Sequence, residues 1–180
     1  MKSLYCTLAI IIATLTAYAQ TIHGTYAIKN LASGMVLRIK DANTANGTPI
    51  VPYSPVNWKC VTWDFRNIEG QTYQLKNLFS GKTLQPKTAA AEGVSLEEQP
   101  IAGQQYELLP NENNSYLIRV KGTALYITQG EDNIVLAAKK KDLQSQSWIL
   151  VEQHPTMYNG SSFNRDEIKK GYSLTETAGC

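Results

Sequence analysis

One short sequence motif recurs three times along the chain, and this repetition constrains the fold more than any single residue does. The motif opens on a tyrosine, with Ile or Leu two residues later and Lys or Arg three residues later, at Tyr26–Asn30, Tyr73–Asn77 and Tyr116–Val120. Each repeat closes on an aromatic residue in a short apolar run, at Trp63, Tyr106 and Trp148. A near-constant period of about 40 residues indicates three copies of one supersecondary unit packed on each other.

The repeats read as strands, because helical periodicity is nearly absent between Thr21 and Gln153. Short alternating runs rich in β-branched and aromatic residues are typical of half-buried strands, and Gly, Asn, Pro and Ser between them mark turns. The first repeat predicts four strands, centred on residues 26–28, 36–39, 50–53 and 63–66. The sequence therefore predicts an all-β fold.

Four strands per repeat also suit a propeller blade, but three blades fall below the usual minimum of about four. We therefore expect three four-stranded repeats, at about residues 24–69, 70–113 and 114–153, which form a closed barrel capped by hairpins. Apolar residues that recur in register predict a shared core. The three sets are Leu37, Leu84 and Leu125; Ile50, Val94 and Ile134; and Trp63, Tyr106 and Trp148. In this register the third repeat lacks two residues in its first turn.

The two ends of the chain differ from the repeats. Lys2, an apolar run at residues 8–15 and the triplet Ala17-Tyr18-Ala19 predict a signal peptide at residues 1–19. The apolar run is too short to span a membrane. We expect a secreted protein, extracellular or periplasmic, after cleavage near Ala19. The strand pattern stops by His154, so residues 154–180 predict a tail or linker.

Charge and cysteine content exclude two classes of protein. The formal net charge is +2, too balanced for a chain that binds bulk nucleic acid. Of the three cysteines, Cys6 lies in the predicted signal peptide. Cys60 and Cys180 remain, which excludes a disulfide framework and leaves room for one bridge without a pattern that supports it.

The closing motifs carry a family resemblance. Gln146-Ser147-Trp148 is a complete Gln-x-Trp, Gln104-Gln105-Tyr106 has Tyr for Trp, and Val61-Thr62-Trp63 keeps only the Trp. Together with the threefold period, these motifs resemble the ricin-type lectin family, over residues 24–153. The resemblance implies a β-trefoil fold, with a Gln-x-Trp signature in each repeat, and carbohydrate binding.

The resemblance also implies where sugar would bind. Each pocket of the family uses an Asp just after the Leu of the second strand, a Gln in the third strand, and an aromatic platform two residues later. The Asp positions here hold Arg38, Gln85 and Tyr126. The Gln and aromatic positions hold Val51 and Tyr53, then Ser95 and Glu97, then Val135 and Ala137. All three pockets therefore depart from the family pattern.

Candidate carbohydrate-binding residues remain in two repeats. In the first, a sugar ring would stack on Tyr53 or Trp58, with polar groups around it. The alternative is that both rings pack against their own hairpin. In the second repeat Gln85 and Glu97 would meet across a pocket, and in the third we expect no site. The candidates are Arg38, Asp41, Tyr53, Asn57, Trp58, Gln85 and Glu97.

The sequence contains no catalytic constellation. His23 and His154 lie at opposite ends of the repeats, without a Cys, Asp or Glu at metal-ligand spacing. Glu97 and Glu98 are adjacent, so on a strand they point to opposite faces. We therefore expect no enzymatic activity, no metal and no cofactor.

These observations predict a secreted, non-catalytic carbohydrate-binding domain with partly eroded pockets. Its partners would be glycans or a polysaccharide, without nucleic acid and without insertion into a membrane. Two alternatives remain open. One is a β-trefoil that binds a secreted protein, such as a protease inhibitor. The other is a carbohydrate-binding module of a larger secreted hydrolase.

Overall fold

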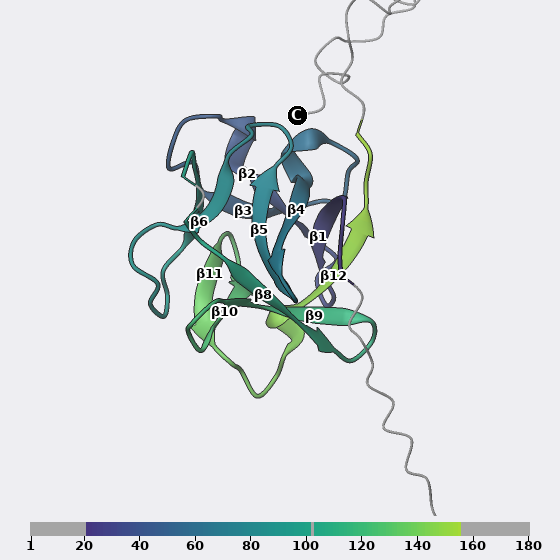
Figure 1. Ribbon diagram of the computed structural model, residues 1–180, viewed down its shortest axis with the longest axis vertical. Helices are drawn as coiled ribbons and strands as arrows, with labels where there is room; N and C mark the ends of the chain where they lie inside the picture. Colours follow the sequence, from purple (N-terminus) through teal and green to yellow (C-terminus); the bar gives the residue numbers. More distant parts are fainter. Residues whose placement is uncertain (1–20, 102, 156–180) are drawn as a thin grey trace, which may run out of the picture.

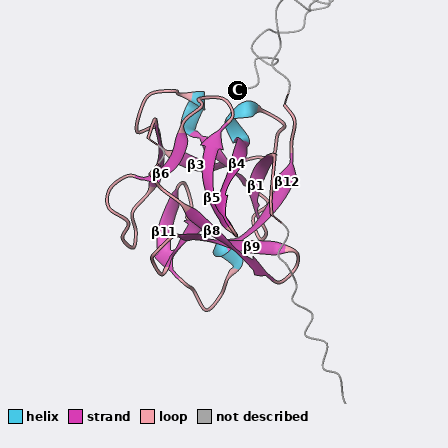
Figure 2. Ribbon diagram, in the orientation of Figure 1, coloured by secondary structure: helices cyan, strands magenta, loops and turns pink. Residues whose placement is uncertain are grey.

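The computed structural model describes residues 21–155 except residue 102, and the predicted signal peptide and most of the predicted tail lie outside this part (Figure 1). The described residues form strands, turns and three short 3-10 helices (Figure 2). The strands are β1 (Thr25–Asn30), β2 (Val36–Ile39), β3 (Ile50–Tyr53), β4 (Thr62–Glu69), β5 (Thr72–Asn77), β6 (Thr83–Pro86), β7 (Leu96–Gln99), β8 (Tyr106–Asn111), β9 (Ser115–Val120), β10 (Leu125–Gln129), β11 (Ile134–Ala138) and β12 (Ser147–Glu152). The helices are η1 (Lys40–Ala42), η2 (Lys59–Val61) and η3 (Gln144–Gln146).

Six of the strands pair in a closed ring and form a barrel. β1 pairs with β4, β4 with β5, β5 with β8, β8 with β9, β9 with β12, and β12 with β1, all antiparallel. The other six strands form three hairpins, β2–β3, β6–β7 and β10–β11. The predicted all-β trefoil of three four-stranded repeats is therefore confirmed.

The opening and closing residues of each repeat are direct partners on neighbouring strands of the barrel. Tyr26 pairs with Trp63, Tyr73 with Tyr106, and Tyr116 with Trp148. Neighbouring strands place such partners' side chains about 5 Å apart on one face. The recurring tyrosine and the recurring aromatic closer are thus two halves of one contact, which each repeat forms once.

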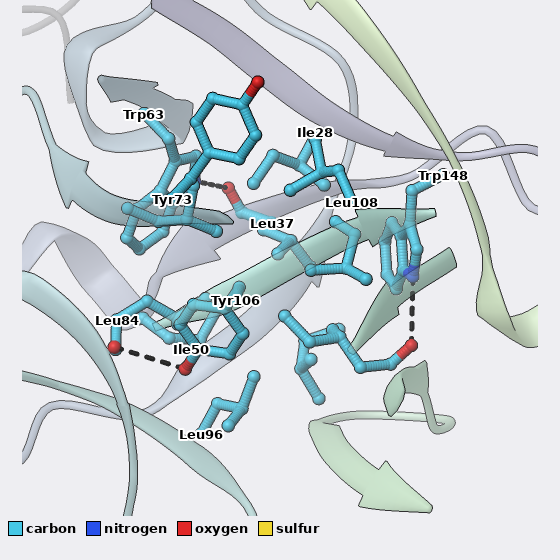
Figure 3. Close-up of a cluster of buried hydrophobic side chains, with 14 of the residues drawn as sticks. Ile28, Leu37, Ile50, Trp63, Tyr73, Leu84, Leu96, Tyr106, Leu108 and Trp148 are labelled. Atoms are coloured by element: carbon cyan, nitrogen blue, oxygen red, sulfur yellow. Dashed lines mark hydrogen bonds between the residues drawn. The ribbon is translucent and has the colours of Figure 1, made fainter. Parts of the chain in front are cut away.

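Each closing ring also fixes a hairpin to the barrel by one hydrogen bond. Trp63 Nε1 donates to the Leu37 carbonyl at 3.2 Å, and Tyr106 Oη donates to the Leu84 carbonyl at 3.2 Å. Trp148 Nε1 donates to the Ile127 carbonyl at 3.0 Å. All three rings are fully buried in one apolar cluster, which also holds the first residues of β3, β7 and β11 (Figure 3). Burial raises the pKa of the Tyr106 hydroxyl far above its usual range.

The last of these hydrogen bonds corrects the predicted register of the third repeat. Ile127, not Leu125, is the third-repeat counterpart of Leu37 and Leu84, and Leu125 is only half-buried at the edge of the core. As many residues separate Tyr116 from Ile127 as separate Tyr26 from Leu37, so the predicted deletion in the third turn was wrong.

The second correction concerns the third strand of the second repeat. Leu96 is the first residue of β7 and is fully buried, as Ile50 is in β3 and Ile134 in β11. Val94 precedes the strand and is half-buried. Leu96 therefore takes the core position predicted for Val94.

Candidate functional site

The hairpin pairings define which residues occupy equivalent places in the three repeats. Arg38 lies opposite Val51 in the first hairpin, Gln85 opposite Glu97 in the second, and Thr128 opposite Val135 in the third. The position two residues further along the third strand holds Tyr53, Gln99 and Ala137 respectively. Thr128 therefore replaces Tyr126, and Glu97 and Gln99 replace Ser95 and Glu97, as the counterparts of the family's pocket residues.

The first hairpin brings three of the predicted residues together. The Arg38 guanidinium lies 4.0 Å from the centroid of the Tyr53 ring, and the rings of Tyr53 and Trp58 lie 6.3 Å apart at 31°. A guanidinium at this distance is held by cation–π attraction. One face of Tyr53 is therefore covered by a side chain of the same hairpin.

Tyr53 and Trp58 also pack inwards. Both rings contact a small apolar cluster formed by Ala27, Val36, Cys60 and Val61. Cys60 in this cluster is fully buried and disulfide-bonded; Cys6 and Cys180 lie outside the described residues. Asn57 is exposed beside Trp58. The two rings thus combine a structural role with partial exposure.

Asp41 lies away from this cluster, in η1 near the tip of the first hairpin. It lines a hollow of about 380 Å³ formed by residues 40–49, together with Asn43 and Asn46. Asp41 and Ala42 have φ angles of 53° and 50°, in the left-handed region that non-glycine residues seldom adopt. The hollow is polar and belongs to a loop, not to the Tyr53 face.

The second hairpin places a carboxylate and two amides on one face. Glu97 and Gln85 lie directly opposite each other, and each has less than a tenth of its surface exposed. Gln99 Nε2 donates to Glu97 Oε1. Among the described residues, Gln99 is the only hydrogen-bond donor to this carboxylate. Its second oxygen is therefore free to accept a hydrogen bond from a ligand.

Neighbouring groups hold this face in place. Gln85 Nε2 donates to Thr83 Oγ1 at 2.9 Å and to the Ile101 carbonyl at 3.2 Å. A Cβ atom at Gly47, in the loop of the first hairpin, would lie 3.6 Å from Glu97 Oε2. Gly47 has a φ angle of 81°, so a side chain there would be strained as well as close to the carboxylate.

Glu98 points to the opposite face, as its position next to Glu97 predicts. It is fully buried against Leu84, with Ser80 Oγ donating to Oε2 and Lys82 Nζ 3.9 Å from Oε1. Oε1 accepts no hydrogen bond from a described residue. Burial raises the pKa of the Glu98 carboxyl, which the Ser80 hydrogen bond and the Lys82 charge offset only in part.

We expect the Glu98 carboxyl to make stability depend on pH. Because folding raises its pKa above the usual 4.5, Glu98 favours the folded state at low pH and loses this contribution as pH rises through the raised pKa. Glu98→Gln should therefore stabilise the domain by about 1 kcal/mol at pH 8, and by less at pH 4. Urea unfolding at both pH values measures this, with Glu92→Gln as an exposed control. A stability difference that is constant or falls with pH would contradict the assignment.

A side chain of η3 covers the equivalent face of the third hairpin. Gln146 Nε2 donates to Thr128 Oγ1 and to the Ala138 carbonyl, both at 2.9 Å, and Gln146 Oε1 accepts from the Lys140 amide. Gln146 is fully buried. The Gln of the one complete Gln-x-Trp motif is thus a structural residue here.

The described residues contain no cluster of three or more His, Cys, Asp and Glu side chains that would hold a metal ion. No helix within residues 21–155 has the length and apolar character needed to cross a membrane.

Sequence reasoning missed three residues of the hairpin faces: Thr83, Gln99 and Thr128. Thr83 accepts a hydrogen bond from the Gln85 amide, Gln99 donates to Glu97, and Thr128 accepts from the Gln146 amide. The alternation in β6 and β10 carried the signal for Thr83 and Thr128, because each lies two residues from a position that the sequence assigned to a hairpin face.

Comparison with known proteins agrees with the geometry. Residues 15–99 match the family described as "Ricin-type beta-trefoil lectin domain-like". This range includes the first repeat and most of the second. Over these residues, somewhat less than half of the chain, the sequence is similar to that family, and the described residues have the β-trefoil fold. No curated protein matches the chain.

Solved structures share this fold at low sequence identity. ThreeFoil, a designed threefold symmetric protein, is 20% identical with a TM-score of 0.67, over 72% of this chain and 99% of its own. The Macrolepiota procera ricin B-like lectin is 22% identical with a TM-score of 0.64, over 74% and 99%. An exo-beta-1,3-galactanase from Clostridium thermocellum is 21% identical with a TM-score of 0.65, over 72% of this chain and 30% of its own.

Proposed function

We propose that this chain is an exported, non-catalytic carbohydrate-binding domain whose principal sugar contact is the outer face of the second hairpin. One observation carries the proposal. The ricin-type pocket sets a carboxylate on the second strand of a repeat opposite an amide on the third. Gln85 and Glu97 lie opposite each other in these two places, with the carboxylate and the amide exchanged.

The chemistry of this pair suits sugar hydroxyls. A carboxylate accepts charge-assisted hydrogen bonds, which are stronger than those between neutral groups. An amide both donates and accepts. Glu97 has one oxygen available, and Gln99 holds the other. The similar Macrolepiota procera lectin was solved in complex with lactose, which supports a glycan as the class of ligand.

The first hairpin is the weaker candidate within this proposal. Its Asp and Gln positions hold Arg38 and Val51, so it has no carboxylate opposite an amide. Arg38 covers one face of Tyr53. Stacking on Trp58 is the remaining contact that this hairpin offers to a sugar ring.

Export is supported by the sequence of residues 1–19, and the non-catalytic role by the lectin-like family match. Both belong to the proposal. Detection of a mature chain that begins near Gln20 in the extracellular or periplasmic fraction tests the first part.

A glycan array of residues 20–180 tests the function. We expect binding to at least one glycan class, and Glu97→Gln should weaken that binding about 10- to 100-fold, because a charge-assisted hydrogen bond contributes about 1.5–3 kcal/mol. Glu112→Gln, the same change of charge on the exposed turn between β8 and β9, is the matched control. Binding lost in Tyr53→Ala or Trp58→Ala but kept in Glu97→Gln would move the site to the first repeat. An array without any binding would overturn the carbohydrate-binding function.

A further inference from the structure

The barrel contains three equivalent strand junctions, each beside one hairpin. They are β12–β1 beside β2–β3, β4–β5 beside β6–β7, and β8–β9 beside β10–β11. In β4 the buried residues Trp63 and Phe65 alternate with Asp64 and Arg66, so the latter two face outwards. The register of each pair gives the outward residues at the same two places in all three junctions.

The first place carries a lysine or arginine in every repeat, but with different partners. Lys76 lies opposite Asp64, Arg119 opposite Glu107, and Lys29 opposite Ile149. Arg119 and Glu107 form an ion pair at 2.7 Å, which occupies the outer face of that junction. Among the described residues, neither Lys76 nor Asp64 forms an ion pair, although the two lie opposite each other.

The second place separates the β4–β5 junction from the other two. There Arg66 lies opposite Gln74, whereas the β8–β9 junction holds Leu109 and Leu117, and the β12–β1 junction holds Val151 and Ala27. Arg66 is exposed, and it too forms no ion pair within the described part of the chain. The β4–β5 junction alone thus presents two basic side chains without a bound acidic partner.

These side chains surround a hollow of about 370 Å³. It is lined by the outward residues of β4 and β5 together with Gly81, Thr83 and Pro100 of the second hairpin. A Cβ atom at Gly81 would lie 3.7 Å from Lys76 Cε, so the lysine stem runs close along this turn. The volume lies within the usual range for small-molecule sites, about 300–1,000 Å³.

We propose that this hollow binds the carboxylate-bearing sugar of an acidic glycan, a uronic acid residue. Arg66 and Lys76 provide charge-assisted hydrogen bonds to the carboxylate. Asp64, between them on the same face, accepts hydrogen bonds from hydroxyl groups. A ligand with one carboxylate and several hydroxyls on a single ring satisfies both kinds of group. A simple anion without hydroxyls is repelled by Asp64 and offers it no hydrogen bond.

The hollow adjoins the sugar face of the second hairpin, and the inference rests on the proposed function of that face. Thr83 lines the hollow and accepts the hydrogen bond from Gln85, which lies opposite Glu97. A glycan that contacts Glu97 would thus continue into the hollow with its neighbouring sugar. The acidic residue is the feature that the hollow selects.

Nuclear magnetic resonance titration of isotope-labelled residues 20–180 tests this inference, because it detects weak binding. The probes are galacturonic acid, galactose and acetate at equal ionic strength. We expect galacturonic acid to perturb the amide signals of β4 and β5 and to bind at least about fivefold more tightly than galactose or acetate. Arg66→Ala and Lys76→Ala should each remove this preference. Lys29→Ala, at the equivalent place in the first repeat, should keep it.

The outcomes separate this inference from the function that it refines. Equal binding of galacturonic acid and galactose, with Glu97-dependent glycan binding intact, would overturn the acidic site and leave the proposed function in place. Acetate that binds as tightly as galacturonic acid would overturn recognition of a sugar. Failure of every sugar probe, together with a blank glycan array, would overturn both.

Discussion

Trp148→Ala is expected to lower the free energy of unfolding by about 3–5 kcal/mol, the usual cost of removing a large buried aromatic residue. Trp148 is fully buried in the shared core, and its Nε1 donates to the Ile127 carbonyl at 3.0 Å. The substitution therefore leaves both a cavity and an unpaired carbonyl. Because small domains have stabilities of about 5–15 kcal/mol, the loss is a large fraction of the total.

Chemical denaturation followed by circular dichroism measures the Trp148 effect. Trp58→Ala is the matched control, since Trp58 is half-buried at the edge of the small apolar cluster. We expect the Trp58 variant to lose markedly less stability. Equal losses for the two variants would contradict the assignment of Trp148 to the central core and of Trp58 to the edge of the small apolar cluster.

Gln146→Ala is expected to cost about 2–3 kcal/mol of unfolding free energy. The substitution leaves the Lys140 amide and the Ala138 carbonyl without their partner at a fully buried position, and it removes the donor to Thr128. Buried polar groups left unpaired cost about 1–3 kcal/mol each, and water that enters the space offsets part of this.

Gln104→Ala is the matched control, because Gln104 holds the same motif position in the second repeat. Gln104 is half-buried, and among the described residues its amide donates only to the neighbouring Gln105 carbonyl. We expect a loss below about 1 kcal/mol. If both variants lose the same stability, the structural role of Gln146 in the motif is refuted.

The sequence was sufficient to predict the threefold architecture. The opening tyrosines and the aromatic closers recur because each pair forms the same contact between neighbouring barrel strands. The tyrosines are Tyr26, Tyr73 and Tyr116. Such a contact has to be satisfied in every repeat, so its residues recur at a fixed spacing. The turns after β1 and β5 recur for a similar reason, since Asn30 and Asn77 each accept two backbone amides there.

Strand alternation could not set the register in two strands. Leu125 and Ile127 are both apolar and lie on the same face of β10, and Val94 and Leu96 differ by two residues in the same way. A pattern with a period of two is unchanged by a shift of two residues. The hydrogen bond from Trp148 to Ile127 and the pairing of Gln85 with Glu97 settle the register, and neither is visible in the sequence.

That shift of two residues changed the geometry of the candidate site. The sequence predicts that Gln85 and Glu97 meet across a pocket, but its register places Ser95 opposite Gln85 and Glu97 at the aromatic position. The observed pairing brings Glu97 opposite Gln85. The hollow beside β4 and β5 could not be predicted from the sequence for a related reason. Its lining depends on which residues of two barrel strands and a hairpin lie next to one another in the fold.

The most direct test of the account is to map the bound glycan on the protein. Residues 20–180, labelled with nitrogen-15, are titrated with the strongest glycan from the array, and perturbed amide signals are assigned. The account predicts perturbations concentrated at Gln85 and at Glu97–Gln99, and their loss in Glu97→Gln but not in Glu112→Gln. Perturbations confined to Tyr53 and Trp58, or to the third hairpin, would contradict it.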